Sequence, residues 1–227
     1  MEIVFLLLTV LGLSLFEIIT SIDNAIINAE VLGGMGQRAR RWFLLYGFFF
    51  AVFVVRGLLP FMIVWIANPS IGPIGVLTAA FSNDPKIIDA IEQSSPLLLL
   101  GGGVFLIFLF FNWLFLEPKN FGLRGEGFFQ RQGAWFFAVV SILLTVIVWF
   151  ALQKGPMLGF AAVVGSTAFF IIHGFRQFAE EQEQKMIGGN MSDLSKIAYL
   201  EVLDSTFSID GVIGAFAFTF FVPLILI

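Results

Sequence analysis

Six long apolar segments follow one another along the chain, and this succession limits the possible folds more than any other feature. Each has about 20 residues or more, the length that a helix needs to cross the hydrocarbon core of a bilayer; they are 3–32, 42–67, 97–116, 133–152, 157–178 and 196–227. Only 12% of the 227 residues are charged, whereas a soluble domain has about 25%. We therefore predict an all-α polytopic membrane protein with about six transmembrane helices, forming one transmembrane domain over residues 1–227.

The basic residues predict how the chain crosses the bilayer. Nine of the twelve Lys and Arg residues fall in the loops 33–41, 117–132 and 175–196, which alternate with loops that hold only Lys86 and Lys154. Because short cytoplasmic loops are enriched in Lys and Arg, we predict that both termini are outside (N-out, C-out), and we expect a bacterial inner membrane. The formal net charge of −4 gives no reason to expect nucleic acid as a partner, since binding a polyanion needs a basic surface.

The first and last apolar segments are too long to be single straight crossings. A helix of about 30 residues is about 45 Å long, against a hydrocarbon core of about 30 Å. Segments 3–32 and 196–227 must therefore tilt, protrude or break. Residues 71–81, which follow the second segment, could form a loop or a re-entrant segment, and the sequence leaves both open.

Ionisable residues inside the predicted spans carry the most information. Six acids lie in the first and last spans and one base in the second: Glu17, Asp23, Glu30, Glu201, Asp204, Asp210 and Arg56. A carboxylate near the bilayer centre costs about 2.5–3.5 kcal/mol on the insertion scale, so these acids must be paired, protonated, hydrated or bound to a ligand. One arginine cannot neutralise six acids, and the balance favours a cation site over an anion site. Glu30, close to Arg38, fits an interfacial position.

Helical spacing gathers several of these acids with neutral oxygen groups. With about 100° per residue, two polar stripes result: Glu17, Ser21, Asn24 and Asn28 in the first span, and Glu201, Asp204, Ser205 and Ser208 in the last. Asp23 and Asp210 fall off these stripes in a straight helix. A break near the Ser-Ile-Asp sequence of each helix would bring them back, so we predict that both helices are broken there.

The same two regions resemble each other. Residues 17–26 (EIITSIDNAI) align without gaps on residues 204–213 (DSTFSIDGVI) at a constant offset of 187. Since the predicted orientation makes the two spans antiparallel, the pattern is typical of transporters with inverted repeats, whose broken helices bind an ion near the midplane. The available carboxylate, amide and hydroxyl oxygens suit Mn²⁺, Ca²⁺ or Mg²⁺. The chain has no cysteine for a thiolate site.

Three segments resemble the TerC family of integral membrane proteins, which is grouped with the lysine-exporter-like transporters: LFEIITSIDNA (15–25), YGFFFAVFVVRGLLP (46–60) and YLEVLDSTFSIDGVIGAFA (199–217). The resemblance is closest to a branch usually described as uncharacterised. Members of the family are associated with Mn²⁺ export and metal homeostasis. The resemblance implies an ion site lined by Glu17, Asp23, Asn24, Glu201, Asp204 and Asp210, with Ser21, Asn28, Arg56, Ser208 and Gly211 in support.

Two departures from the family pattern add expectations. The family usually has an acid near position 112, where this chain has Asn112, and its members continue through further helices after the second motif. The chain would then be a fragment or a naturally short form, or another subunit would complete the bundle. Arg56 matches a basic residue of the family's second span, and we favour for it the role of partner to an acid over that of a charge on the ion path.

Three functions are open from the sequence. The leading one is export of a divalent cation, Mn²⁺ favoured and Ca²⁺ as the alternative, by alternating access around the intramembrane carboxylates, with protons as a candidate counter-ion. The second is a non-transporting metal sensor or scaffold in a membrane complex. The third is an intramembrane aspartyl protease with Asp23 and Asp210 as its dyad, although the usual Gly-x-Gly-Asp context is absent. We expect no enzyme activity and no prosthetic group; the expected partners are the lipid bilayer, the metal ion and an oligomer or further subunit.

Overall fold

The computed structural model describes residues 2–79, 85–117, 128, 131–187, 192–219 and 222–225. Within these ranges the chain is helical apart from short turns, and no β-strand occurs. The elements are α1 (Glu2–Gly33), α2 (Gln37–Trp42), the π-helical segments η1 (Phe43–Gly47) and η2 (Phe50–Val55), α3 (Arg56–Ala67), the 3₁₀ turn η3 (Pro69–Ile71), α4 (Gly72–Ala79), α5 (Pro85–Phe115), α7 (Trp135–Lys154), α8 (Pro156–Ile187), α9 (Asp193–Ala215) and α10 (Val222–Ile225). The prediction of an all-helical chain is confirmed.

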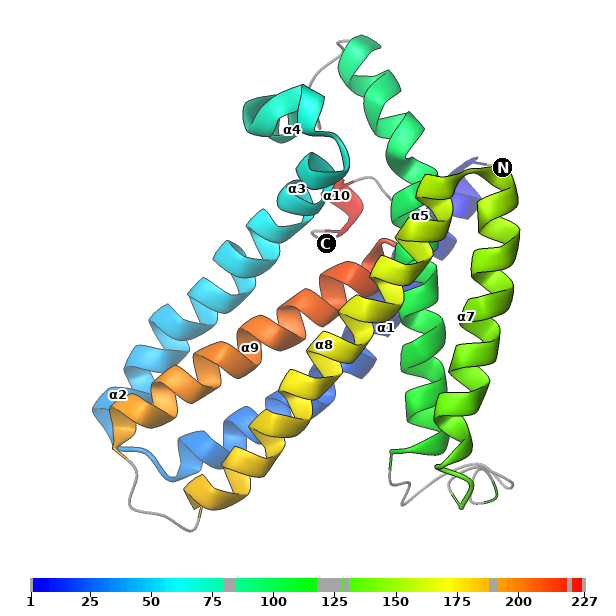
Figure 1. Cartoon of the computed structure of the whole chain (residues 1–227). Coiled ribbons are helices and arrows are strands. Elements are labelled where there is room, and N and C mark those ends of the chain that lie inside the picture. Colours follow the sequence, from blue (N-terminus) through cyan, green and yellow to red (C-terminus); the bar gives the residue numbers. More distant parts are fainter. Residues whose placement is uncertain are drawn as a thin grey trace.

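Consecutive long helices run in opposite directions (Figure 1). The helix ends that border the three basic loops lie together in the lower part of Figure 1: the end of α1 with α2, the end of α5 with the start of α7, and the end of α8 with the start of α9. This arrangement agrees with the grouping of basic residues on one side that the sequence predicts. The side of the bilayer that this end faces stays a prediction.

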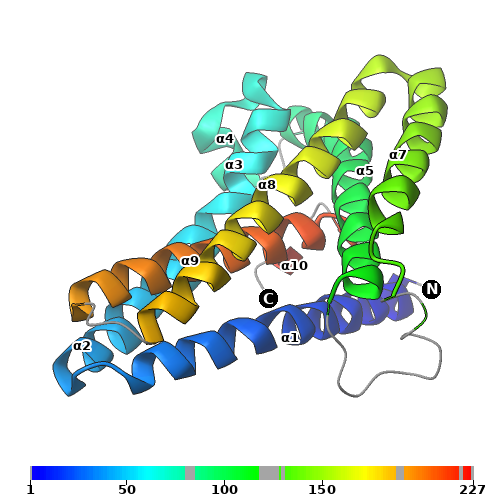
Figure 2. The same ribbon diagram turned by 60° about the horizontal axis from the view of Figure 1, so that its bottom comes forward.

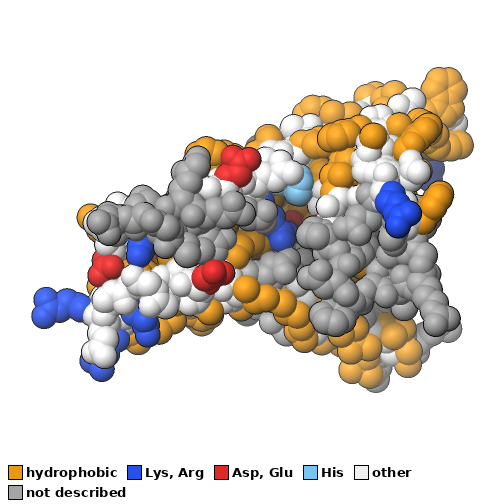
Figure 3. All heavy atoms as spheres, turned by 90° about the horizontal axis from the view of Figure 1, so that it is seen from below, with side chains coloured by type: hydrophobic (Ala, Val, Ile, Leu, Met, Phe, Trp, Pro, Cys, Tyr) orange, Lys and Arg blue, Asp and Glu red, His pale blue; other side chains and the backbone are white. Residues whose placement is uncertain are grey.

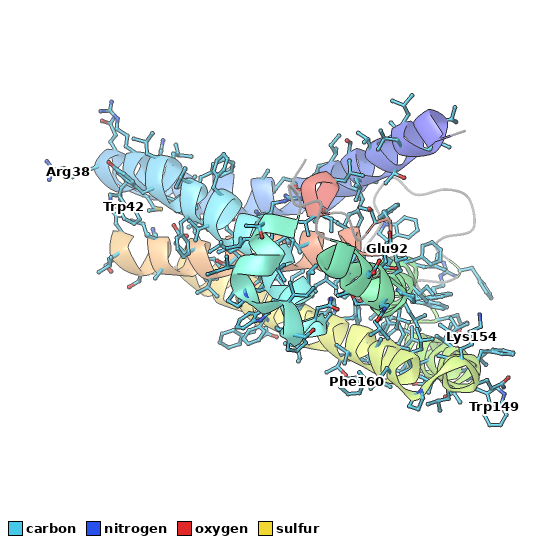
Figure 4. All side chains as sticks on the ribbon, turned by 90° about the horizontal axis from the view of Figure 1, so that it is seen from above. Arg38, Trp42, Glu92, Trp149, Lys154 and Phe160 are labelled. Carbon is cyan, nitrogen blue, oxygen red and sulfur yellow. The ribbon has the colours of Figure 1, made fainter. Side chains whose placement is uncertain are left out.

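Four stretches of the described chain are long and apolar enough to cross a membrane: Leu6–Gly33, Asp89–Phe115, Trp135–Lys154 and Pro156–Phe178. A fifth results if the bent pair Phe53–Ala67 and Pro69–Thr78 is counted as one span. Large apolar side chains point outward from these helices, as Trp149 and Phe160 do in Figure 4. Several long apolar helices thus indicate a multi-pass membrane protein. The predicted sixth span, which contains α9, is not among them, because charged residues recur along that helix.

The predicted second span is the irregular one. After α2 the chain passes through η1 and η2 before the regular helix α3 begins at Arg56. α3 ends at Ala67, and the next helical stretch turns away by 103°. The bend follows from Pro69, because proline disfavours the helical conformation in the residue before it, and from Gly72, whose φ of +73° suits glycine. The sequence leaves undecided whether residues 71–81 form a loop or a re-entrant segment. Residues up to 79 are helical, and residues 80–81 lie outside the described residues.

The predicted breaks at the two Ser-Ile-Asp sequences are wrong. α1 is one continuous α-helix, and α9 continues through Asp210 to Ala215. Residues 13–32 and 193–210 contain no proline and no glycine, the commonest causes of a kink. Hydroxyl groups within them bond back to their own helix, as Thr20 does by donating to the carbonyl of Phe16 at 3.0 Å. Among the described residues of the last span, the helix is interrupted after Ala215, where a turn over residues 216–218 follows α9.

α5, α7 and α8 form an apolar three-helix group. α5 and α8 cross with their backbones in contact, because a Cβ built on Gly165 would overlap the carbonyl of Gly101. Aromatic rings fill the space between the helices; those of Phe108 and Phe169, for example, meet edge to face with centroids 5.6 Å apart. In lipid, such close packing drives helix association in place of the hydrophobic effect. The group's buried aromatic residues are Phe105, Phe108, Phe115, Phe136 and Phe169.

Candidate cation site

α1 and α9 lie side by side and antiparallel (Figures 1 and 2), with polar side chains along their contact. As residue numbers rise along α1, those of the contacted residues fall along α9: Glu17 lies at Gly211, and Asn28 binds Asp204. The antiparallel relation of the two related segments is therefore confirmed. We call this contact, together with the residues of η1, η2 and α3 that border it, the polar seam; its members are Glu17, Ser21, Asn24, Asn28, Gly47, Ala51, Arg56, Glu201, Asp204, Ser208 and Gly211.

Glu17 and Arg56 form an ion pair in the upper half of the seam. Arg56 directs both terminal nitrogens of its guanidinium group to the two carboxylate oxygens of Glu17. Ser21, one turn further along α1, donates a hydrogen bond to Glu17 Oε1 at 2.8 Å. Gly211 forms the opposite wall, where a Cβ would lie 3.2 Å from Glu17 Oε2. Arg56 is thus the partner of an acid, and the charge of Glu17 is balanced by a bidentate contact.

Asp204 and Asn28 meet in the lower half of the seam. Asp204 is only 3% exposed, and its Oδ1 accepts a hydrogen bond of 2.6 Å from Asn28 Nδ2. Asn24 also lies beside Asp204. Two further oxygens here, Asp204 Oδ2 and Asn28 Oδ1, are buried and accept no hydrogen bond from the described part of the chain. Because an unsatisfied buried acceptor costs free energy, this position favours a proton or a cation.

The contacts of the two motifs are reciprocal. In the alignment of the motifs, Glu17 corresponds to Asp204 and Asn24 corresponds to Gly211. Glu17 lies at Gly211, and Asn24 lies beside Asp204, so each motif offers the same two positions to the other. Reciprocal contact of this kind is what a two-fold relation between two segments produces. The relation is seen for this helix pair, while an inverted repeat of the whole chain stays a prediction.

Glu201 is held by the shape of its surroundings rather than by hydrogen bonds. Its carboxylate lies against Gly47 in η1, where a Cβ would overlap Oε1. Both carboxylate oxygens are buried, and within the described ranges neither accepts a hydrogen bond. The negative charge of Asp204, one turn away, also acts on the Glu201 carboxylate. Ser208, on the same stripe, donates a 3.2 Å hydrogen bond to the carbonyl of Ala51 in η2, so the predicted second stripe faces the π-helical segments as well as α1.

Asp210 lies on a different face of α9 from Asp204. It is 4% exposed, and the charges that act on it are those of Arg176, Glu117 and Glu17. Since α9 has no break at Asp210, this side chain stays off the stripe of Asp204. Asp23 belongs to α1 by its backbone, and its side chain lies outside the described residues. The surface of the molecule that is seen from below in Figure 3 has a hollow, in which a histidine and basic and acidic side chains are visible.

Two cavities border the seam. One, of about 220 Å³, is lined by Glu17, Arg56 and Gly211 together with apolar residues of α1, α9 and α10. The other, of about 600 Å³, lies between η2, α8 and α9, and its lining includes Glu201 and Ser205. Each cavity therefore reaches one of the acids of the seam.

The chemistry of the oxygen groups suits a hard divalent cation. Among the described residues, no three acidic or histidine side chains converge on one point. The candidate ligands are instead the carboxylates of Asp204 and Glu201 with the amide oxygens of Asn24 and Asn28, a donor set that Mn²⁺, Ca²⁺ and Mg²⁺ accept together with water. The six predicted ligands do not form one group, because Glu17 is occupied by Arg56 and Asp210 faces elsewhere.

The sequence pattern does not single out Gly47 or the two π-helical segments. A glycine in an apolar run is usually interpreted as a packing residue. The close approach of Gly47 to the Glu201 carboxylate depends on how the second span lies against α9. Asn112, which the family pattern singled out, is 1% exposed in α5, and no described residue donates a hydrogen bond to its Oδ1.

The long apolar helices and the buried polar seam together define a polytopic helical membrane protein with acids in its interior. The chain belongs to a family of proteins of unknown function, DUF475, whose family model matches residues 22–227. The match includes every seam residue from Asn24 onward. The comparisons with curated proteins and with solved structures gave no match.

Proposed function

We propose that the protein is a membrane transporter that exports a divalent metal cation, with Mn²⁺ as the favoured cargo. One observation carries the proposal: buried oxygens of Asn28, Glu201 and Asp204 have no hydrogen-bond donor among the described residues, while Arg56, the cation of the seam, is already paired with Glu17. Buried carboxylates need a compensating charge or a proton. A cation that enters the seam supplies that charge.

The packing of α1 suggests how the seam opens. α1 contacts mainly α9, whereas α9 also packs on α3, α5, α8 and η2. A shift of α1 against α9 would therefore expose the seam and leave the α5–α7–α8 group intact, as in transitions that move one rigid element past another. The cavities at Glu17 and at Glu201 would be the two approaches to the seam. In this scheme protons exchange on the same carboxylates as counter-ions.

The resemblance of the three sequence segments to the TerC family supports Mn²⁺ as the cargo and a bacterial inner membrane as the location. The oxygen ligands also fit Ca²⁺, which is the alternative cargo. We further propose that a second copy or another subunit completes the bundle around α1, because the described side chains in the membrane-spanning stretch of α1 are not buried except at its lower end.

The proposal is tested by ion flux into vesicles that contain the purified chain. Wild-type protein should carry Mn²⁺ down an imposed gradient, and Asp204→Asn should abolish that flux, because the substitution removes the charge and keeps the size of the side chain. The matched control is Asp193→Asn on the same helix, since Asp193 is exposed and binds the backbone of Gly36 outside the acid group.

The outcomes separate the candidate functions. Loss of flux in Asp204→Asn with normal flux in Asp193→Asn supports transport through the seam. Saturable Mn²⁺ binding without flux in the wild type would contradict transport and favour a sensor or scaffold. Equal flux in both variants would contradict the assignment of the seam.

A further inference from the structure

We propose that Gly47 is a positioning residue for Glu201. Because Gly47 has no side chain, the Glu201 carboxylate has space to lie near Asp204. Gly47 thereby sets the affinity of the seam for a divalent cation. This inference rests on the proposed function and adds a residue from the second span to a site built on α1 and α9.

The geometry leaves little room for any other residue at position 47. A Cβ on Gly47 would overlap Glu201 Oε1 and would also press on the ring of Phe43. Phe43 is 1% exposed and is packed in one cluster with Val31 and Leu200, so its ring can shift only a little. The Glu201 carboxylate is the end of a flexible side chain and lies closer to the added Cβ, so it makes the larger movement.

Steric fit is what holds this carboxylate. No described residue donates a hydrogen bond to either of its oxygens, so no polar contact would return the carboxylate to its place once a methyl group displaced it. A side chain that packing alone keeps in one rotamer is sensitive to a single added carbon atom. Positioning groups that touch a ligand residue without touching the metal typically change metal affinity by about 10–100-fold.

The π-helical segments explain why the gap occurs here. Gly47 is the last residue of η1, and the hydrogen bond from Ser208 to the Ala51 carbonyl fixes η2 against α9 on the same side. π-helical turns inside α-helices are frequent at functional sites. The irregular second span thus brings its backbone, rather than its side chains, to the acidic stripe of α9.

The chain offers a matched control ten residues further along the same span. Gly57 lies in α3, and a Cβ there would meet nothing within 4 Å. Gly57→Ala and Gly47→Ala make the same change in helix propensity, about 1 kcal/mol in favour of alanine. They differ in what the added methyl group meets, which is Glu201 and the Phe43 ring at position 47 and nothing at position 57.

The test is a double-substitution cycle on the full chain, purified in detergent, with Mn²⁺ affinity measured by titration calorimetry. We expect Gly47→Ala to weaken Mn²⁺ binding by about tenfold and Gly57→Ala to leave it unchanged. Glu201→Asp, which is one methylene shorter, should weaken binding on its own. The combination of Gly47→Ala with Glu201→Asp should bind no more weakly than Glu201→Asp alone, because the shorter carboxyl group already lies clear of the methyl group.

Each result decides the proposal. Unchanged Mn²⁺ affinity in Gly47→Ala would overturn the role of Gly47. So would a double variant whose loss of Mn²⁺ affinity equals the product of the two single losses. If Gly47→Ala fails to fold, a double variant that also fails to fold would overturn it as well. If Gly47→Ala alone fails to fold and Glu201→Asp restores folding, the steric relation holds. Absence of Mn²⁺ binding in the wild type would instead refute the proposed function, which keeps the two failures distinct.

Discussion

The α5–α7–α8 group and the polar seam are both contacts between long helices, yet different groups form them. In the first, glycine backbones and aromatic rings meet, and the ring of His173 stacks on that of Phe169. In the second, carboxylates, amides and one guanidinium meet, and several oxygens have no donor in the part of the chain that the structure describes. Close apolar packing favours one arrangement, whereas incompletely satisfied polar groups in low dielectric are sensitive to added charge. We therefore assign stability to the first region and propose ion binding for the second.

The largest expected effect is on the stability of the three-helix group. Phe169 is 2% exposed and its ring touches those of Phe105, Phe108 and Phe136. Phe169→Ala should lower the free energy of unfolding by about 3 kcal/mol, because it leaves a cavity in the aromatic cluster. Thermal unfolding in detergent measures this loss.

The control is Phe178→Ala on the same helix, where the ring is 60% exposed, and it should leave the midpoint nearly unchanged. If both variants lost the same stability, the aromatic cluster would not be the stable part of the molecule.

The ion pair of the seam should contribute less. Side-chain exposures of 20% for Arg56 and 32% for Glu17 place the pair between surface pairs, worth about 0–1 kcal/mol, and buried pairs, whose disruption costs about 3–5 kcal/mol. A double-mutant cycle with Arg56→Met and Glu17→Gln should therefore give a coupling of about 1–2 kcal/mol in unfolding free energy. A coupling near zero would show that the two side chains do not interact in the bilayer-like environment.

The smallest expected effect distinguishes the two asparagines of α1. Asn28 donates to Asp204 at 2.6 Å, whereas the contact between Asn28 and Asn24 is 3.4 Å long. Asn28→Ala should cost about 1 kcal/mol of stability, within the range of hydrogen bonds in membrane proteins, and Asn24→Ala about half as much. Equal losses in the two variants, measured by chemical unfolding, would contradict the pairing of Asn28 with Asp204.

Sequence periodicity predicted the helical class, and the single polar face of Glu17, Ser21, Asn24 and Asn28 could be read from helical spacing because α1 is regular. The antiparallel orientation of α1 and α9 followed from the loop charges, and the resemblance of the motifs to the TerC family implied that the two helices line one site. The predicted breaks failed, because a length excess does not say whether a helix breaks or protrudes. Two features depend on how the second span lies across α9: the pairing of Arg56 with Glu17 in particular, and the gap at Gly47. No local sequence pattern encodes that crossing.

We propose that a divalent cation binds among Asn28, Glu201 and Asp204. Electron paramagnetic resonance of Mn²⁺ tests it most directly, because the signal of the free aqueous ion disappears on binding. Titration of the wild-type chain should show saturable binding that Asp204→Asn removes and Asp193→Asn keeps. Identical titration curves for the wild type and Asp204→Asn would contradict the account.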